Sequence, residues 1–99
     1  MTVGEINSHD ARWNLSKGNS VLVCAYMEDQ KFQKIRIREA ISFRDFACSV
    51  RCIPKDKQII FYCDTENENL SRDTAEKATC FGFDNIVVLK GGFHGWEKE

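Results

Sequence analysis

The stretch IIFYC, residues 59–63, sets five apolar residues in a row and is followed at once by the polar stretch DTENENLS. The run is β-branched and aromatic, does not alternate with polar residues and is too short for a helix. It therefore predicts a strand that is buried on both faces. Two further runs have the same character, VLVCAY at 21–26 and IVVL at 86–89. Strands of this kind are typical of parallel sheets.

Segments with helical periodicity separate these runs. Ser42 and Ser71 are each well placed to cap a helix, because a serine hydroxyl accepts a hydrogen bond from a free amide of the first turn. The predicted helices are residues 7–17, one from Ser42 to Pro54, one from Ser71 to Gly82, and one after Gly91-Gly92 that includes Trp96. A short strand is predicted around 35–41. Alternating strands and helices predict an α/β fold with a mostly parallel sheet and helices on both faces.

The composition fits a single globular domain over residues 1–99. The chain is 42% hydrophobic and 29% charged, and its net charge is −1. We expect neither a nucleic acid nor a membrane as partner, because there is no basic run and no apolar run of ~18 residues. Five cysteines without the spacing of a disulfide framework favour a reducing cytoplasm. With two histidines and no Cys-x-x-Cys, no metal site or cofactor is expected.

Cys63 is the candidate for chemistry. It ends a predicted parallel strand, and ligands bind beyond the carboxyl ends of such strands. Loop amides and the start of the next helix would favour its thiolate, the nucleophilic form. The carboxylates of Asp64, Glu66 and Glu68 oppose ionisation. A buried, inert thiol is therefore the alternative, since free cysteine is among the most buried residue types.

The stretch from Gln58 to Trp96 resembles the second half of a rhodanese domain, the fold of the thiosulfate and mercaptopyruvate sulfurtransferases. IIFYC resembles the strand that delivers the family's catalytic cysteine, and GFDNIVVLKGGFHGW, residues 82–96, matches the family's closing pattern. VLVCAY and RIREAI, the latter at 36–41, are similar in outline to the first half. The resemblance covers nearly the whole chain and implies a three-layer α/β fold with about five strands.

The resemblance also implies a chemistry. Cys63 would carry sulfane sulfur as a persulfide in a ping-pong cycle, without metal or cofactor. The loop is similar to a longer, acidic family variant, Cys-x-x-x-Asn-Glu-x-x-Ser, and Glu68 stands where many active members have an arginine. The implied substrate-binding residues are Asp64, Thr65, Glu66, Asn67, Glu68 and Asn69.

The acidic loop bears on the donor. Thiosulfate is a dianion, and each carboxylate within about 4 Å would oppose it by roughly 1 kcal/mol in water, and by more where water is excluded. We expect thiosulfate to be a poor donor and a small persulfide, or the persulfide of a partner protein, to be a better one. A sulfur-acceptor protein is a further expected partner.

A rival hypothesis keeps the fold without turnover. The Cys63 loop, or the altered first-half positions around Tyr26 and Arg36, would then recognise another protein. Phosphatase chemistry on a related fold is disfavoured, because this loop lacks the arginine that would bind phosphate.

Other reactive or bulky side chains have simpler interpretations. Cys24 is predicted to lie in the core and Cys80 to pack near a helix end. Trp13 and Trp96 are predicted to pack in the core or at an edge rather than to form a binding platform. Cys48 and Cys52 are predicted to be exposed bystanders rather than relay thiols or half of a metal site. A basic cluster, which could dock an acidic carrier protein, is predicted to be a solvated face; it consists of Lys31, Lys34, Arg36 and Arg38.

Overall fold

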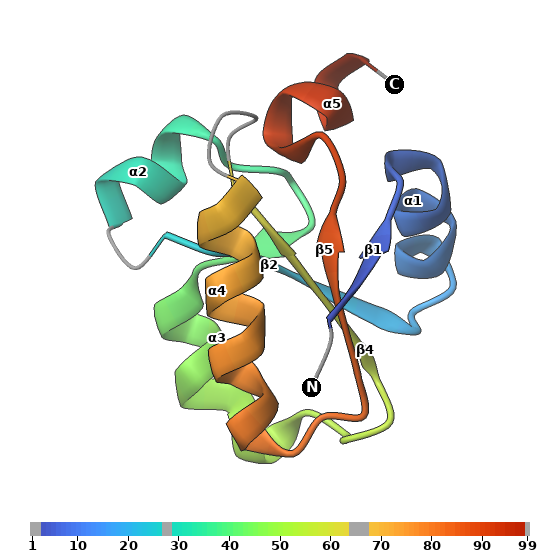
Figure 1. Cartoon of the computed structure of the whole chain (residues 1–99), viewed down its shortest axis with the longest axis vertical. Helices are drawn as coiled ribbons and strands as arrows, with labels where there is room; N and C mark the ends of the chain where they lie inside the picture. The colour runs from blue at the N-terminus through green and yellow to red at the C-terminus, as the bar shows by residue number, and fades with distance from the viewer. Residues whose placement is uncertain (1–2, 27–28, 64–67, 99) are drawn as a thin grey trace.

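A five-stranded parallel sheet forms the centre of the molecule (Figure 1). The computed structural model describes residues 3–26, 29–63 and 68–98. The strands lie in the order β1-β5-β4-β2-β3, and every neighbouring pair is parallel. They are β1 (Gly4–Ile6), β2 (Ser20–Cys24), β3 (Ala40–Ile41), β4 (Gln58–Tyr62) and β5 (Asn85–Leu89). The predicted α/β fold with a parallel sheet is confirmed.

Helices cover both faces of the sheet, which gives three layers (Figure 1). Side chains of α3 and α4 pack on one face, and side chains of α1, α2 and α5 pack on the other. The helices are α1 (Ser8–Ser16), α2 (Asp29–Lys34), α3 (Phe43–Ser49), α4 (Glu68–Ala78) and α5 (Gly92–Lys98), with 3-10 turns η1 (Val50–Cys52) and η3 (Thr79–Phe81).

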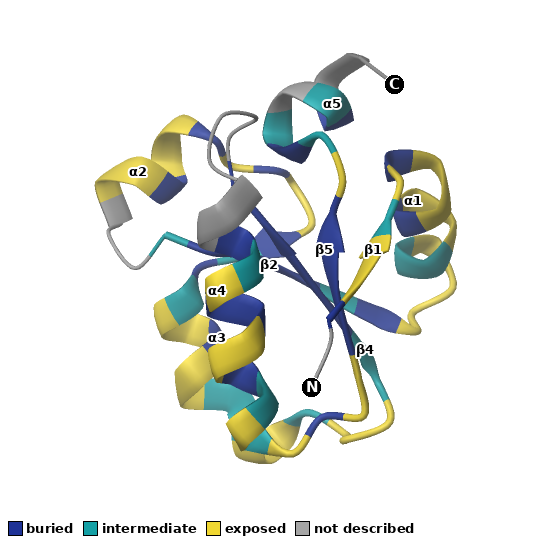
Figure 2. Cartoon of the chain, in the orientation of Figure 1, coloured by how far each residue is buried: buried dark blue, intermediate teal, exposed yellow. Residues whose placement is uncertain are grey.

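The central strands supply most of the largest fully buried side chains, and they are the dark strands of Figure 2. Successive side chains of a strand point to opposite faces, so Ile60 and Tyr62 face α1, α2 and α5 while Ile59 and Phe61 face α3 and α4. Phe46 of α3 meets Phe61 edge to face, with ring centroids 5.6 Å apart. Both faces of β4 are therefore buried, which explains its unbroken apolar sequence.

Local signals set several element ends. Ser42 caps α3 by accepting a hydrogen bond from the Asp45 amide at 3.0 Å. Gly82 ends η3 in the left-handed region, at φ +90°, where a residue without Cβ is favoured. Both ends agree with the sequence prediction.

Two elements were not predicted, and one helix begins earlier than predicted. Strand β1 is three residues long and α2 is six, and both are too short to carry a clear period. Helix α4 begins at Glu68 rather than at Ser71, so Ser71 lies one turn inside it. The helix dipole favours an acidic residue such as Glu68 in the first turn, which fits the earlier start. The sequence prediction instead followed Ser71, because serine is a strongly preferred capping residue.

Among the described helices the longest has 11 residues, and none combines the length and apolar character needed to span a bilayer.

Candidate functional site

Cys63 follows directly after β4, at the carboxyl edge of the sheet. β4 lies between β5 and β2, so the cysteine sits near the middle of that edge. The residue is 0% exposed. The predicted position at the end of a central parallel strand is therefore confirmed, and the thiol is enclosed in the resting structure.

The side chain of Ser71 in α4 contacts this sulfur. Cys63 Sγ donates to Ser71 Oγ at 3.5 Å, and Ser71 is itself only 1% exposed. A hydroxyl accepts from a thiol and can rotate to donate to a thiolate. Ser71 can therefore stabilise the charged, nucleophilic form of Cys63.

Sequence reasoning assigned Ser71 to a helix cap and missed this contact. The available signal was the spacing of small residues along α4, which places Ser71, Thr74, Ala75 and Ala78 at helical intervals of three and four. All four are buried. Read as one inward stripe, that pattern would have turned Ser71 toward the end of β4.

The backbone of Cys63 is held by α5. The Phe93 amide donates to the Cys63 carbonyl at 2.8 Å. Gly91 and Gly92 have φ of 84° and 60°, which lets the chain turn from β5 directly into α5. A Cβ on Gly91 would meet Gly95 Cα at 3.4 Å, so the turn is also closely packed. The Gly-Gly pair therefore fixes the start of α5 against the cysteine.

Cys24 and Tyr62 lie beside Cys63 on the neighbouring positions of the sheet. Cys24 pairs with Tyr62 in register, and both are 0% exposed. Burial raises the pKa of the Cys24 thiol to about 11, although hydrogen bonds with Tyr26 and Tyr62 counter part of the rise. Burial likewise raises the pKa of the Tyr62 hydroxyl. Both groups are therefore neutral at pH 7, and the predicted core role of Cys24 is confirmed.

The Tyr62 hydroxyl also organises the chain beyond α2. It donates to the Ile35 carbonyl at 2.9 Å and accepts from the Ile37 amide at 3.4 Å. Arg36 lies between these two residues. The residue next to Cys63 thus sets where the Arg36 backbone runs.

The predicted substrate-binding residues stay predictions. Asp64, Thr65, Glu66 and Asn67 lie outside the described residues. The backbone of Glu68 and Asn69 forms the first turn of α4, and their side chains lie outside what is described.

The remaining cysteines and tryptophans divide by exposure. Cys48 and Cys52 are exposed, as predicted, and Cys80 is exposed rather than packed, since it falls on the outer side of η3. Trp96 is buried, but Trp13 is 60% exposed on α1, with the Lys17 ammonium 4.6 Å from its ring centre. The packing prediction for Cys80 is thus wrong, and of the two alternatives for Trp13 the core position is excluded. Within the described ranges no three potential metal ligands gather.

The sequence matches the family model described as the rhodanese-like domain over residues 9–99. No curated protein matched in the sequence comparison.

Solved structures show the same fold. A crystal structure of a Bacillus halodurans protein has 25% identity and a TM-score of 0.78, covering 96% of this chain and 72% of that one. A rhodanese-related protein from Thermoplasma volcanium has 21% identity and a TM-score of 0.68, covering 96% and 91%. A single-domain sulfurtransferase of Saccharomyces cerevisiae has 15% identity and a TM-score of 0.73, covering 99% and 91%.

Proposed function

The chain belongs to the rhodanese-like family, and from this premise we propose that it is a sulfurtransferase that carries sulfane sulfur on Cys63. The observation that carries the proposal is the hydrogen bond between Cys63 Sγ and Ser71 Oγ at the carboxyl end of a central strand. A hydroxyl held against the sulfur lowers the cost of ionising a buried thiol.

The cycle has two transfers. The Cys63 thiolate attacks the outer sulfur of a persulfide donor, the donor's S–S bond breaks, and the donor leaves as a thiolate that takes up a proton. An acceptor thiolate then attacks the outer sulfur of the Cys63 persulfide, which releases the Cys63 thiolate and yields the acceptor persulfide. The sulfur passes as a neutral atom, so no external oxidant or reductant is needed. Amides of residues 64–69 are the proposed donors to the persulfide anion.

The proposed donor is a small persulfide or a protein persulfide rather than thiosulfate. Asp64, Glu66 and Glu68 give the segment after Cys63 three carboxylates and no arginine. Each would oppose a dianion more strongly than a monoanion. We expect a higher rate with a low-molecular persulfide than with thiosulfate, and thiosulfate turnover at an equal rate would contradict this part of the proposal.

Intact mass measured after incubation with a sulfane-sulfur donor tests the function directly. One added sulfur, about 32 Da, is expected on the parent chain. The three exposed cysteines are competing targets, so the decisive sample is the variant in which Cys48, Cys52 and Cys80 are all serine.

That triple variant should still gain one sulfur, and adding Cys63→Ala should abolish the gain. The sulfur should then leave Cys63 when a thiol acceptor is added. If the triple variant takes up no sulfur from persulfide or thiosulfate donors, the sulfurtransferase proposal fails.

A binding module that does not turn over is the second candidate, and one observation favours it: the Cys63 residue is 0% exposed. A module would show a Cys63 that resists alkylation at pH 7 while the chain still binds a partner protein. In either role the thiol needs reducing conditions, which is why we propose a cytoplasmic setting.

A further inference from the structure

An open hollow of about 380 Å³ lies at the same edge of the sheet as Cys63. It is formed where α2, the end of β3 and the start of α3 meet, and it is called the arginine hollow below. Its lining residues are Phe32, Gln33, Arg36, Ser42, Arg44 and Asp45. Ser42 follows the last residue of β3, which places the hollow at a carboxyl end of the parallel sheet, where ligands of such sheets bind.

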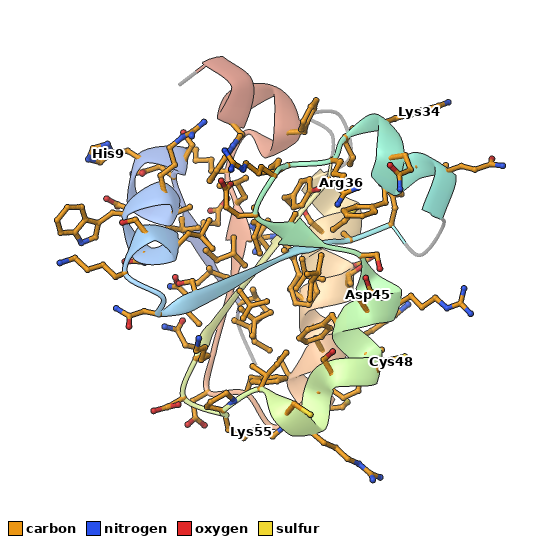
Figure 3. All side chains as sticks on the ribbon, turned by 180° about the vertical axis from the view of Figure 1, so that it is seen from behind. His9, Lys34, Arg36, Asp45, Cys48 and Lys55 are labelled. Carbon is orange, nitrogen blue, oxygen red and sulfur yellow. The ribbon has the colours of Figure 1, made fainter. Side chains whose placement is uncertain are left out.

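The charged groups of the hollow favour an anion. The lining residues carry two guanidinium groups, those of Arg36 and Arg44, and one carboxylate, that of Asp45. Arg36 is exposed, lies 5.7 Å above the Phe32 ring, and makes no ion pair with any residue in the described part of the chain. A planar guanidinium held on an aromatic face is preorganised for a carboxylate. Figure 3 shows Arg36 and Asp45 on the same side of the molecule.

The hollow is tied to the cysteine through Tyr62. The Tyr62 hydroxyl bonds the residues on either side of Arg36, and Tyr62 directly precedes Cys63. Burial raises the pKa of Tyr62, and the positive charge of Arg36, whose two sequence neighbours bond the Tyr62 hydroxyl, counters part of that rise. β3 lies two strands from β4. Strands are spaced about 4.8 Å apart, so the end of β3, which borders the hollow, lies roughly 10 Å across the sheet from the end of β4.

From this juxtaposition we infer that the arginine hollow binds a carboxylate of the thiol that exchanges sulfur with Cys63, and so selects thiols with an acidic group about 10 Å from their sulfur. The inference rests on the proposed function for its substrate, though the anion site itself does not. Three extended residues span about 10 Å, so a short peptide thiol with a free C-terminus has the required reach.

A matched pair of acceptors tests the selection: N-acetyl-Cys-Gly-Gly and the same peptide with a C-terminal amide. Sulfur is loaded on Cys63, and KM for its discharge is measured with each peptide. The acid should have a KM about fivefold lower than the amide, because one partly exposed charge pair contributes up to about that factor.

Variants assign the preference to the hollow. Arg36→Gln should make the KM values of the acid and amide peptides equal, and Asp45→Asn should increase the difference between them. Arg38→Gln is the matched control, since Arg38 is exposed two residues away, loses the same charge and does not line the hollow. Equal KM values for acid and amide on the parent, or a preference that survives Arg36→Gln, would overturn the inference.

A binding measurement separates this inference from the enzyme proposal. N-acetyl-Ser-Gly-Gly cannot accept sulfur, and it is titrated into Cys63→Ala while amide chemical shifts are followed. Shifts around Arg36 and Arg44 that the amide peptide does not cause would support the anion site even if no sulfur transfer occurs. Absence of such shifts, in a protein that does transfer sulfur, would refute the site and leave the sulfurtransferase proposal standing.

Discussion

Replacing Ser71 with alanine is expected to slow alkylation of Cys63 about tenfold at neutral pH. The hydroxyl lies 3.5 Å from Cys63 Sγ, and both residues are buried, so water does not replace it when it is removed. The thiolate then loses a hydrogen-bond donor, while the neutral thiol, itself a weak donor, loses only a weak hydrogen bond. Because the thiolate is the reactive species, its population sets the rate.

The magnitude follows from the strength of a hydrogen bond to a charged group, about 1.5–3 kcal/mol. A contact of 3.5 Å is long, so the lower end applies. A difference of about 1.4 kcal/mol changes an equilibrium tenfold, and the thiolate fraction at neutral pH falls by that factor.

The assay is the rate of iodoacetamide labelling in the variant with serine at 48, 52 and 80, so that exposed thiols do not contribute. Cys24 does not interfere, because burial keeps its pKa at about 11. Thr74→Ala is the control for packing, since Thr74 is also buried on the inner face of α4. Loosening of the helix alone would expose Cys63 and speed labelling, so the sign of the change separates the two causes.

Labelling of Ser71→Ala at the parent rate, with Cys63→Ala showing no labelling, would refute the reasoning. The hydroxyl would then be a packing group, and the stability of a Cys63 thiolate would have to come from other donors.

Three further predictions concern the frame around the site. Arg12→Ala should lower the free energy of unfolding by about 2 kcal/mol in a urea titration, because Arg12 donates to the Trp96 carbonyl at 2.7 Å and its guanidinium lies 4.1 Å from the centre of the buried Trp96 ring. Lys17→Ala is the control, because Lys17 lies over the exposed Trp13 ring, and it should change the free energy of unfolding by less than about 0.5 kcal/mol. Equal losses in the two variants would contradict this prediction. Phe46→Ala should cost about 3–5 kcal/mol by the same measurement, since four other phenylalanine rings lie within 6.0 Å of its centre, and a loss under about 1 kcal/mol would show that the core refills. Burial raises the Cys24 pKa from 9.0 to about 11, so the unfolded chain ionises this thiol first and the free energy of unfolding should fall as the pH rises from 9 toward 11. The urea midpoint of Cys24→Ala should fall less than that of the parent over the same pH range. Midpoints that fall equally in both proteins would contradict the prediction.

Much of the fold could be predicted because the side chains of its central strands are buried on both faces of the sheet. IIFYC and IVVL cannot be helices or half-exposed strands, and their runs agree with β4 and β5 within one residue. β1 was missed for the opposite reason: Gly4–Ile6 is a three-residue edge strand whose residues are exposed or half-buried, so its sequence carries no apolar pattern. Its pairing depends on β5, which is distant along the chain.

The site was predictable in position and not in contacts. Cys63 follows from the strand alone, since a strand end fixes one residue at the edge of the sheet. The inward direction of Ser71 was readable from the small-residue stripe of α4, but its contact with Cys63 Sγ also depends on how α4 packs against the end of β4. The hydrogen bonds from Tyr62 and Phe93 join residues 25 to 30 positions apart and depend on tertiary packing.

The two ionisable neighbours of Cys63 on the sheet carry no negative charge at pH 7, so an anion on Cys63 would not be repelled by them. The neighbours that could ionise, Cys24 and Tyr62, stay neutral at pH 7 because burial raises the pKa of each. A thiolate or persulfide anion on Cys63 therefore meets no anion from β2 or β4, and the Ser71 hydroxyl can supply one donor. Under the proposed function, the carboxylates that follow Cys63 in the sequence would repel a charge on the substrate near the sulfur, and Arg36 of the proposed hollow would attract an acidic group farther out. Repulsion close by and attraction about 10 Å away would then select a donor or acceptor by where its charge lies, and not by net charge alone.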